Sequence, residues 1–212
     1  VKYDHLVIAM GSTTADFGIP GVAENARGMK TVSEALTIRS EVMRAYEVMC
    51  RENNTATHDI AIVGGGPTGV EMAGAFAELV RGPLSSDFKP AANRIQVSII
   101  EAGPHLVPSF SESLSRKTQQ DLEKLGVTVR TNTAVKEVLS DSIITTDGSV
   151  LSANTTVWAA GVKGVPAMEK LHMPITRGRI DVTSTLQVTG YENIWALGDI
   201  AGVAGKDGNF LP

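Results

Sequence analysis

The chain has 212 residues, of which 42% are hydrophobic and 20% are charged, a composition typical of a folded globular protein and not of a disordered or fibrous one. Its formal net charge of −4 argues against nucleic acid as a partner, because phosphate binding requires a basic surface. No apolar stretch reaches 18 residues, and the only cysteine, Cys50, excludes an internal disulfide and a CxxC redox pair. The four histidines share no metal-ligand spacing, so no metal site is predicted.

The first predicted elements are a strand and a long helix. Residues 2–12 form a strand that ends in a glycine turn and has no element before it, which suggests that the chain starts inside a fold. After the turn-rich stretch 18–21, Thr31 and Glu34 form a capping box for a helix from about Val32 to Glu52. Its inward apolar positions are Ala35, Ile38, Val42, Ala45, Tyr46 and Met49.

Residues 59–79 hold the most informative pattern in the chain. A continuous apolar run, Ile60 to Val63, is typical of a parallel strand that is buried on both faces. A G-x-G-x-x-G fingerprint follows it and opens a helix, in the residues Gly64, Gly65, Gly66, Pro67, Thr68 and Gly69. The first motif glycine permits a tight turn, the second lets backbone approach a pyrophosphate, and the third allows close helix packing. The helix N-terminus favours a diphosphate, so the pattern predicts a dinucleotide site, with a ligand-free turn as the alternative.

The next predicted strand, residues 95–100, ends at Glu101. An acidic side chain at this position can accept hydrogen bonds from ribose hydroxyls and would repel a 2′-phosphate, so the predicted ligand is NAD rather than NADP. Glu101 follows Gly69 by 101 − 69 = 32 residues, more than the roughly 20 of the standard unit. We attribute the excess to a surface insertion over residues 81–93. A solvated carboxylate at the strand end is the alternative for Glu101.

The second half of the chain predicts one helix and several short strands. Ser111 can cap a helix that ends at Gly126 and carries inward Leu114, Thr118, Leu122 and Leu125. Strand-like segments with a hairpin turn at 147–148 predict a small antiparallel β-meander inserted into a parallel fold; they cover residues 127–130, 135–139, 142–146 and 150–151. Apolar strands return at 155–159 and 193–197.

Three predicted strands end in turns of small residues, at 9–11, 159–161 and 197–199. Doubly wound folds bind ligands at strand ends, and small residues there let a cofactor approach the backbone. The three turns together therefore predict a second cofactor surface, although each alone has an ordinary structural explanation. Its candidate residues are Ala9, Gly11, Ala160, Gly161, Gly198 and Asp199.

The chain resembles the two-dinucleotide-binding flavoproteins, the pyridine nucleotide-disulfide oxidoreductase superfamily, and within it the type II NADH:quinone oxidoreductases. The resemblance is carried by Gly18-Ile-Pro-Gly-Val22, Pro67-Thr-Gly-Val-Glu71, VWAAGV and NIWALGDIA. It implies an α/β fold in which a Rossmann-like NAD-binding domain, with a parallel sheet and a small antiparallel β-meander, is flanked by partial FAD-domain segments. The implied divisions are 1–30, a partial FAD-binding segment and linker; 31–162, the NAD-binding domain; and 163–212, the return segment of the FAD-binding domain.

The resemblance implies an FAD-dependent enzyme that passes hydride from NADH to FAD and then electrons to a quinone. Asp199 would bind the ribityl chain of FAD, and Glu71 would be catalytic near the flavin and nicotinamide; the alternative for Glu71 is a carboxylate favoured by the helix dipole in the first helical turn. The first FAD glycine motif and the family's quinone-lining and membrane-binding segments lie outside these residues. We therefore expect a fragment, inactive alone, whose FAD site is incomplete and empty.

Further expectations concern location, assembly and competing functions. The isolated chain is expected to be cytoplasmic, and the full-length protein to be peripheral on the cytoplasmic membrane, where it meets the quinone; a homodimer is left open. Another FAD-dependent NADH reductase, with a ferredoxin, rubredoxin or disulfide partner, is one alternative, and a non-catalytic NAD-sensing module is another. The runs Gly66-Pro-Thr-Gly-Val-Glu71 and Gly18-Ile-Pro-Gly21 favour the quinone enzyme.

Overall fold

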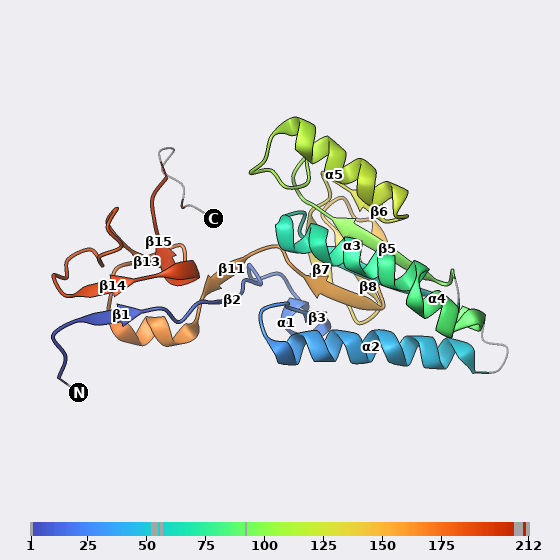
Figure 1. Cartoon of the computed structure of the whole chain (residues 1–212), viewed down its shortest axis with the longest axis horizontal. Coiled ribbons are helices and arrows are strands. Elements are labelled where there is room, and N and C mark those ends of the chain that lie inside the picture. Colours follow the sequence, from blue (N-terminus) through green and yellow to red (C-terminus); the bar gives the residue numbers. More distant parts are fainter. Residues whose placement is uncertain (1, 52–54, 56, 92, 206–209, 211–212) are drawn as a thin grey trace. The chain divides into compact units, whose positions relative to one another are not determined.

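A computed structural model describes residues 2–51, 55, 57–91, 93–205 and 210 (Figure 1). The chain forms two compact units: unit 1 combines Val1–Ala15 with Val162–Pro212, and unit 2 is Asp16–Gly161. Residues 16–30, which the sequence analysis grouped with the first segment, thus belong to unit 2. They do so because Val22 and Ala26 are buried in its core beside Trp158.

The centre of unit 2 is a five-stranded parallel sheet with the order β3-β10-β4-β5-β6. The strands are Ala26–Arg27 (β3), Thr155–Trp158 (β10), His58–Val63 (β4), Ile95–Ile100 (β5) and Thr128–Arg130 (β6). Ile60, Ile62 and Ile99 are fully buried, as expected for strands covered on both faces. Val63 is level with Trp158 on one side and with Ile100 on the other, so these strands end at one common edge.

Each face of this sheet has its own cover. The helices α2 (Val32–Cys50), α3 (Pro67–Arg81) and α5 (Glu112–Lys124) pack on one face, where Val42, Phe76 and Leu122 join the core (Figure 1). The short helix α1 (Val22–Asn25) and an antiparallel meander cover the other face. The meander consists of β7 (Val135–Val138), β8 (Ser142–Thr145) and β9 (Val150–Ser152). The expected α/β fold with a parallel sheet and a small meander is confirmed.

Helix α2 begins where its capping box predicts. The Thr31 hydroxyl accepts a hydrogen bond from the Glu34 amide at 3.2 Å, and the Glu34 carboxylate accepts one from the Thr31 amide at 2.7 Å. The buried face of the helix consists of Ile38, Val42, Tyr46 and Met49, as the apolar spacing predicts. Cys50 ends the helix and is half-buried.

Several predicted elements differ in the structure. The surface insertion over 81–93 contains the helix α4 (Pro83–Asp87) and the 3-10 helix η1 (Lys89–Ala91), and their Leu84 and Ala91 are buried in the core. Strand β6 extends the parallel sheet beside β5 and does not join the meander. The tertiary contacts of these segments decide both cases, because short apolar runs do not specify their partners.

One of the predicted inward positions of helix α5 differs in the structure, although Leu122 is buried in the core as predicted. Leu114, which was predicted to point inward, is 53% exposed, and its neighbour Ser115 is buried instead. The Ser115 hydroxyl donates to the Leu106 carbonyl at 2.6 Å. This side-chain bond satisfies the buried hydroxyl and explains why a polar residue occupies the inner position.

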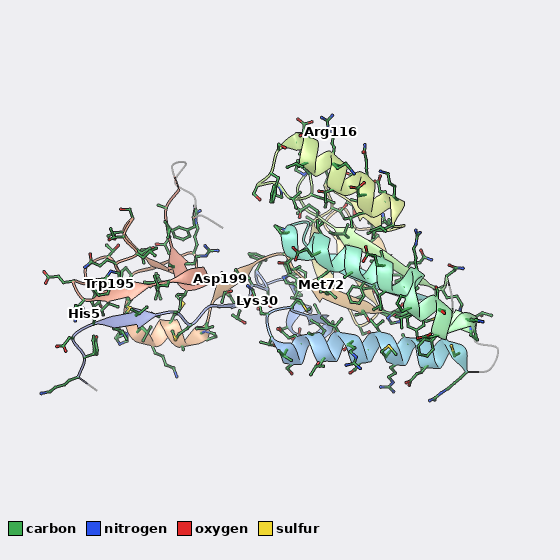
Figure 2. All side chains as sticks on the ribbon, in the orientation of Figure 1. His5, Lys30, Met72, Arg116, Trp195 and Asp199 are labelled. Atoms are coloured by element: carbon green, nitrogen blue, oxygen red, sulfur yellow. The ribbon has the colours of Figure 1, made fainter. Side chains whose placement is uncertain are left out.

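Unit 1 is built mainly from short strands. Strand β1 (Leu6–Ile8) pairs in parallel with β14 (Ile194–Ala196), and β2 (Ser12–Thr14) pairs antiparallel with β11 (Val162–Gly164). A third sheet holds β12 (Ile175–Thr176), β13 (Arg179–Asp181) and β15 (Ala201–Gly202), and the 3-10 helices are η2 (Pro166–Leu171) and η3 (Gly198–Ile200). The predicted strand over 2–12 is thus only partly regular. The ring centroids of His5, just before β1, and Trp195, within β14, lie 5.5 Å apart; Figure 2 labels both residues.

In the described part of the chain, none of the helices is both long and apolar enough to cross a bilayer.

Candidate functional site

The turn between β4 and α3 requires glycine at two positions. Gly64 has φ +113°, in the region that favours glycine, and a Cβ there would lie 2.6 Å from the carbonyl carbon and oxygen of Ala159. A Cβ on Gly69 would lie 1.9 Å from the Gly64 carbonyl oxygen. The helix α3 therefore presses directly onto the turn, which is the geometry that the glycine spacing predicts.

Gly66 differs from both, because its surroundings are open. A Cβ built at Gly66 would meet no atom within 4 Å, and the residue is the N-cap of α3, followed by the exposed Pro67 and Thr68. Among the described residues no side chain caps this helix. The amides of the first helical turn and their partial positive charge are therefore available to an anion at Gly66.

The carboxylate of Glu101 is fixed beside this turn. It is half-buried; one oxygen accepts from the Gly65 amide at 2.6 Å and the other from the Gly103 amide at 2.6 Å. Hydrogen bonds to a charged acceptor are among the stronger ones in proteins. Each oxygen has further lone-pair capacity, so the same carboxylate can also accept from hydroxyl groups of a ligand.

The loop after Glu101 holds the glycine turn from its other side. The Val107 amide donates to the Gly65 carbonyl at 2.7 Å. The amide of Gly65 is bonded to Glu101 and its carbonyl to this loop, so both of its backbone polar groups have partners. Val107 is buried and has φ +44°, a conformation that β-branched residues rarely adopt. Leu106, fully buried, would contact a Cβ on Gly65 at 2.7 Å. The sequence analysis missed this loop. The one feature of the sequence that indicates it is a glycine, Gly103, two residues after Glu101.

A cavity of about 240 Å³ opens at the same edge of the sheet. Its lining includes Gly64 and Glu101 together with Ala160, which follows β10. Gly161 is close to Phe17, since a Cβ on Gly161 would lie 2.7 Å from the tip of that ring. Phe17 itself is 64% exposed, lines the cavity and was also missed, because nothing in a lone aromatic residue before a turn indicates a distant contact.

Glu71 lies on α3 and its side chain is exposed. The sequence analysis placed it in the first helical turn, which was wrong: α3 starts at Pro67, so Glu71 is its fifth residue, and the first turn holds no acidic residue. Because the effect of the helix dipole fades beyond the first turn, that explanation for Glu71 is weakened.

The remaining predicted residues form a second group, within unit 1. Strands β1 and β14 are parallel neighbours, so their carboxyl ends lie side by side. Ala9 and Gly11 follow the end of β1, and Gly198 and Asp199 follow the end of β14. The Ser12 hydroxyl donates a hydrogen bond to the Asp199 carboxylate at 2.6 Å. Figure 2 labels Asp199. Gly11 and Gly198 have φ +69° and +75° and open surroundings. Ser12 is a further polar residue that the sequence analysis did not single out.

Known proteins are similar to this chain over nearly its whole length. The family model described as pyridine nucleotide-disulphide oxidoreductase matches residues 1–209. A relative named type II NADH:quinone oxidoreductase, from Haemophilus influenzae, is 32% identical over 100% of this chain and 52% of its own length. Another, from Mycobacterium tuberculosis, is 33% identical over 97% of this chain and 48% of its length.

A solved structure is similar over nearly the whole chain. It is NDH2 from Plasmodium falciparum in complex with NADH, with a TM-score of 0.87 and 31% identity, covering 97% of this chain and 45% of that one. The chain spans about half the length of the relatives that it matches.

Proposed function

Because the chain belongs to the pyridine nucleotide-disulphide oxidoreductase family, we propose that it is the NADH-binding part of an FAD-dependent NADH:quinone oxidoreductase. The observation that carries the proposal is the open N-terminus of α3 at Gly66 next to the fixed carboxylate of Glu101. The relatives named type II NADH:quinone oxidoreductase and the NADH complex of a similar protein support it.

The residues of unit 2 fit the nucleotide as follows. The diphosphate would bind the amides of the first turn of α3, for which Gly64, Gly65, Gly66, Pro67, Thr68 and Gly69 provide the backbone. Glu101 would accept hydrogen bonds from the adenine ribose and repel a 2′-phosphate. Ala160 and Gly161 would let the nucleotide approach the backbone at the end of β10.

In unit 1, Asp199 would bind the ribityl chain of FAD with Ser12 orienting its carboxylate, beside the small residues Ala9, Gly11 and Gly198. When bound, NADH supplies a hydride, and FAD accepts it and passes the electrons to a quinone. Glu71 is proposed to handle charge near the reacting rings. The chain's own contribution is therefore to bind, orient and select the nucleotides.

The finer points of the proposal concern the chain by itself. Since it spans about half the length of its relatives, we propose that it binds NADH, lacks stoichiometric FAD and is inactive alone. The complete protein would be peripheral on the cytoplasmic side of the membrane, with the quinone as its acceptor, and a homodimer is one assembly to examine. An absorbance spectrum of the purified chain with one flavin per chain would contradict the FAD part.

The nucleotide assignment has a direct test. We expect calorimetric titration of the chain to show saturable binding of NADH and much weaker binding of NADPH, because the Glu101 carboxylate repels the extra phosphate. ADP-ribose is the matched ligand, since it keeps the ribose and diphosphate but lacks the nicotinamide. Equal affinities for NADH and NADPH would refute the role of Glu101, and the absence of any binding would refute the site.

A further inference from the structure

A second, larger cavity lies at the opposite edge of the unit 2 sheet, where β4 and β10 begin. Its volume is about 510 Å³, within the range of small-molecule sites. His58 starts β4 and lines this cavity, whereas the glycine turn follows Val63 at the other end of the strand. Five steps of roughly 3.3 Å separate the two ends, so the cavity is distinct from the proposed nucleotide site.

A buried hydroxyl group lines the cavity and has no partner in the part of the chain that the structure describes. Thr156 is 2% exposed and lines the cavity, and its Oγ1 makes no hydrogen bond to any described residue. The adjacent Thr155 shows the ordinary arrangement, since its hydroxyl lies 2.9 Å from Nε2 of His58. Native proteins rarely bury a polar group unpaired, because the lost hydrogen bonds to water are not replaced. The Thr156 hydroxyl is therefore available to hydrogen-bond a ligand in the cavity.

The charged side chains that line the cavity are balanced. Arg27 and Glu41 form an ion pair at 3.0 Å. Arg44, on α2, and Glu24, on α1, have no ion-pair or hydrogen-bond partner for their side chains in the described part of the chain. One cation and one anion are thus left, which suits a ligand that carries both charges and no net charge.

The remaining lining is neutral or apolar. Burial lowers the pKa of His58, against the opposing effects of the Asp59 and Glu41 charges, which favours the uncharged ring. On the helix side the lining residues are Ala45, Val48 and Met49, and Val48 is 44% exposed. Met49 is already buried in the core, so an apolar ligand group can bury surface mainly against Val48 and the half-buried Ala45.

We propose that this cavity binds a zwitterionic amino acid with an apolar side chain. Its carboxylate faces Arg44, its ammonium group faces Glu24, and its side chain contacts Val48 and Ala45. The Thr156 hydroxyl supplies a hydrogen bond to the polar end of the ligand. This site is separate from the nucleotide site and does not depend on the proposed redox function.

The first experiment tests Thr156. L-leucine, L-methionine and L-phenylalanine are titrated into the chain by calorimetry, and at least one is expected to bind saturably. Thr156→Val keeps the shape of the side chain and should weaken that binding about tenfold through the loss of one hydrogen bond, whereas Thr156→Ser should retain it. Thr156→Val should also leave the thermal unfolding temperature of the free chain unchanged or raised, because it removes an unpaired hydroxyl.

The second experiment tests the two charges. Arg44→Gln and Glu24→Gln should each weaken the binding of the same ligand. The matched change Arg39→Gln, elsewhere on α2, should leave that binding unchanged. N-acetyl-leucine lacks the ammonium group and leucinamide lacks the carboxylate, so both should bind more weakly than leucine. The proposal is overturned if no amino acid binds saturably, if Thr156→Val or either charge variant binds as tightly as the unchanged chain, or if N-acetyl-leucine binds as tightly as leucine. It is also overturned if Thr156→Val destabilises the free chain.

Discussion

The carboxylate of Glu101 has two functions in the proposed nucleotide site. It is the expected ligand of the adenine ribose, and it also holds the Gly65 and Gly103 amides at 2.6 Å each. The glycine turn and the ribose ligand are therefore parts of one hydrogen-bonded unit. A change of cofactor preference at this position cannot be separated from the geometry of the turn.

We predict that Glu101→Gln weakens NADH binding without creating tight NADPH binding. The single amide oxygen of glutamine can replace one acceptor, and its NH₂ group would face a backbone N–H donor. The free energy of unfolding should fall by roughly 1–3 kcal/mol, the cost of leaving such a group unsatisfied. Urea unfolding and nucleotide titration measure the two effects; an NADPH-specific variant of unchanged stability would disagree with the observed contacts.

Gly66, at the N-terminus of α3, and Gly74, in the middle of that helix, give a matched pair. Gly66 has φ −71° and open space for a Cβ, so Gly66→Ala should fold normally and yet obstruct a diphosphate, weakening NADH binding at least tenfold. Gly74→Ala, inside α3, should stabilise the chain by about 1 kcal/mol and leave NADH binding unchanged. Titration of both variants distinguishes them, and tight NADH binding by Gly66→Ala would place the diphosphate elsewhere.

At the scale of elements, local side-chain chemistry sets where α2 begins. Partial burial tends to raise the pKa of Glu34, but hydrogen bonds from the Lys30 amide and from the hydroxyl and amide of Thr31 outweigh it, and the pKa is lowered. A lowered carboxyl pKa stabilises the fold above the ordinary value of 4.5, and that contribution is lost as the pH falls through the folded-state pKa.

Thr31→Ala should therefore reduce the free energy of unfolding by about 1 kcal/mol, because it removes the N-cap hydroxyl. The effect should shrink as the pH falls from 4.5 through the lowered folded-state pKa, where the Glu34 carboxylate becomes protonated in the folded chain. Ser33→Ala, at the second residue of the helix, is the control and should change the free energy of unfolding little. Urea unfolding at neutral and acidic pH provides the measurement, and equal losses for both variants would exclude a specific cap.

The start of β4 gives a second pH-dependent element. Burial lowers the pKa of His58 below 6.5, although the charges of Asp59 and Glu41 oppose this. The unfolded chain then binds more protons than the folded chain just below that value, so stability is complete above about pH 6.5 and falls as the pH decreases. His58→Gln should flatten this part of the stability curve; an unchanged curve would assign the slope to other groups.

At the scale of the whole molecule, the two units carry different parts of the proposed function. The predicted nucleotide residues of unit 2 lie at one sheet edge, and those of unit 1 follow the adjacent strands β1 and β14. The parallel sheet and the meander follow from apolar runs and turn signals in the sequence. The partner of β6 and the helices of residues 83–91 do not, because they depend on contacts between distant segments.

The role of Glu71 is a question for the complete protein. In the polypeptide encoded by the full reading frame around these residues, we expect Glu71→Gln to slow the reduction of FAD by NADH or the reoxidation by quinone, with the bound flavin retained. Stopped-flow absorbance of the flavin measures both half-reactions. If both rates equal those of the unchanged protein, Glu71 is an exposed helix residue without a catalytic role.

The sequence by itself determined what depends on neighbours along the chain. The glycine spacing implies the turn at Gly64, the close packing at Gly69 and the open N-terminus at Gly66, and the Thr31 and Glu34 pair implies the start of α2. Only the tertiary structure decided how Glu101 and Val107 hold Gly65 and how Ser12 meets Asp199. It also decided that the Thr156 hydroxyl lines a cavity with no hydrogen-bond partner among the described residues. These contacts join segments that are distant in sequence, so no local spacing or propensity can specify them.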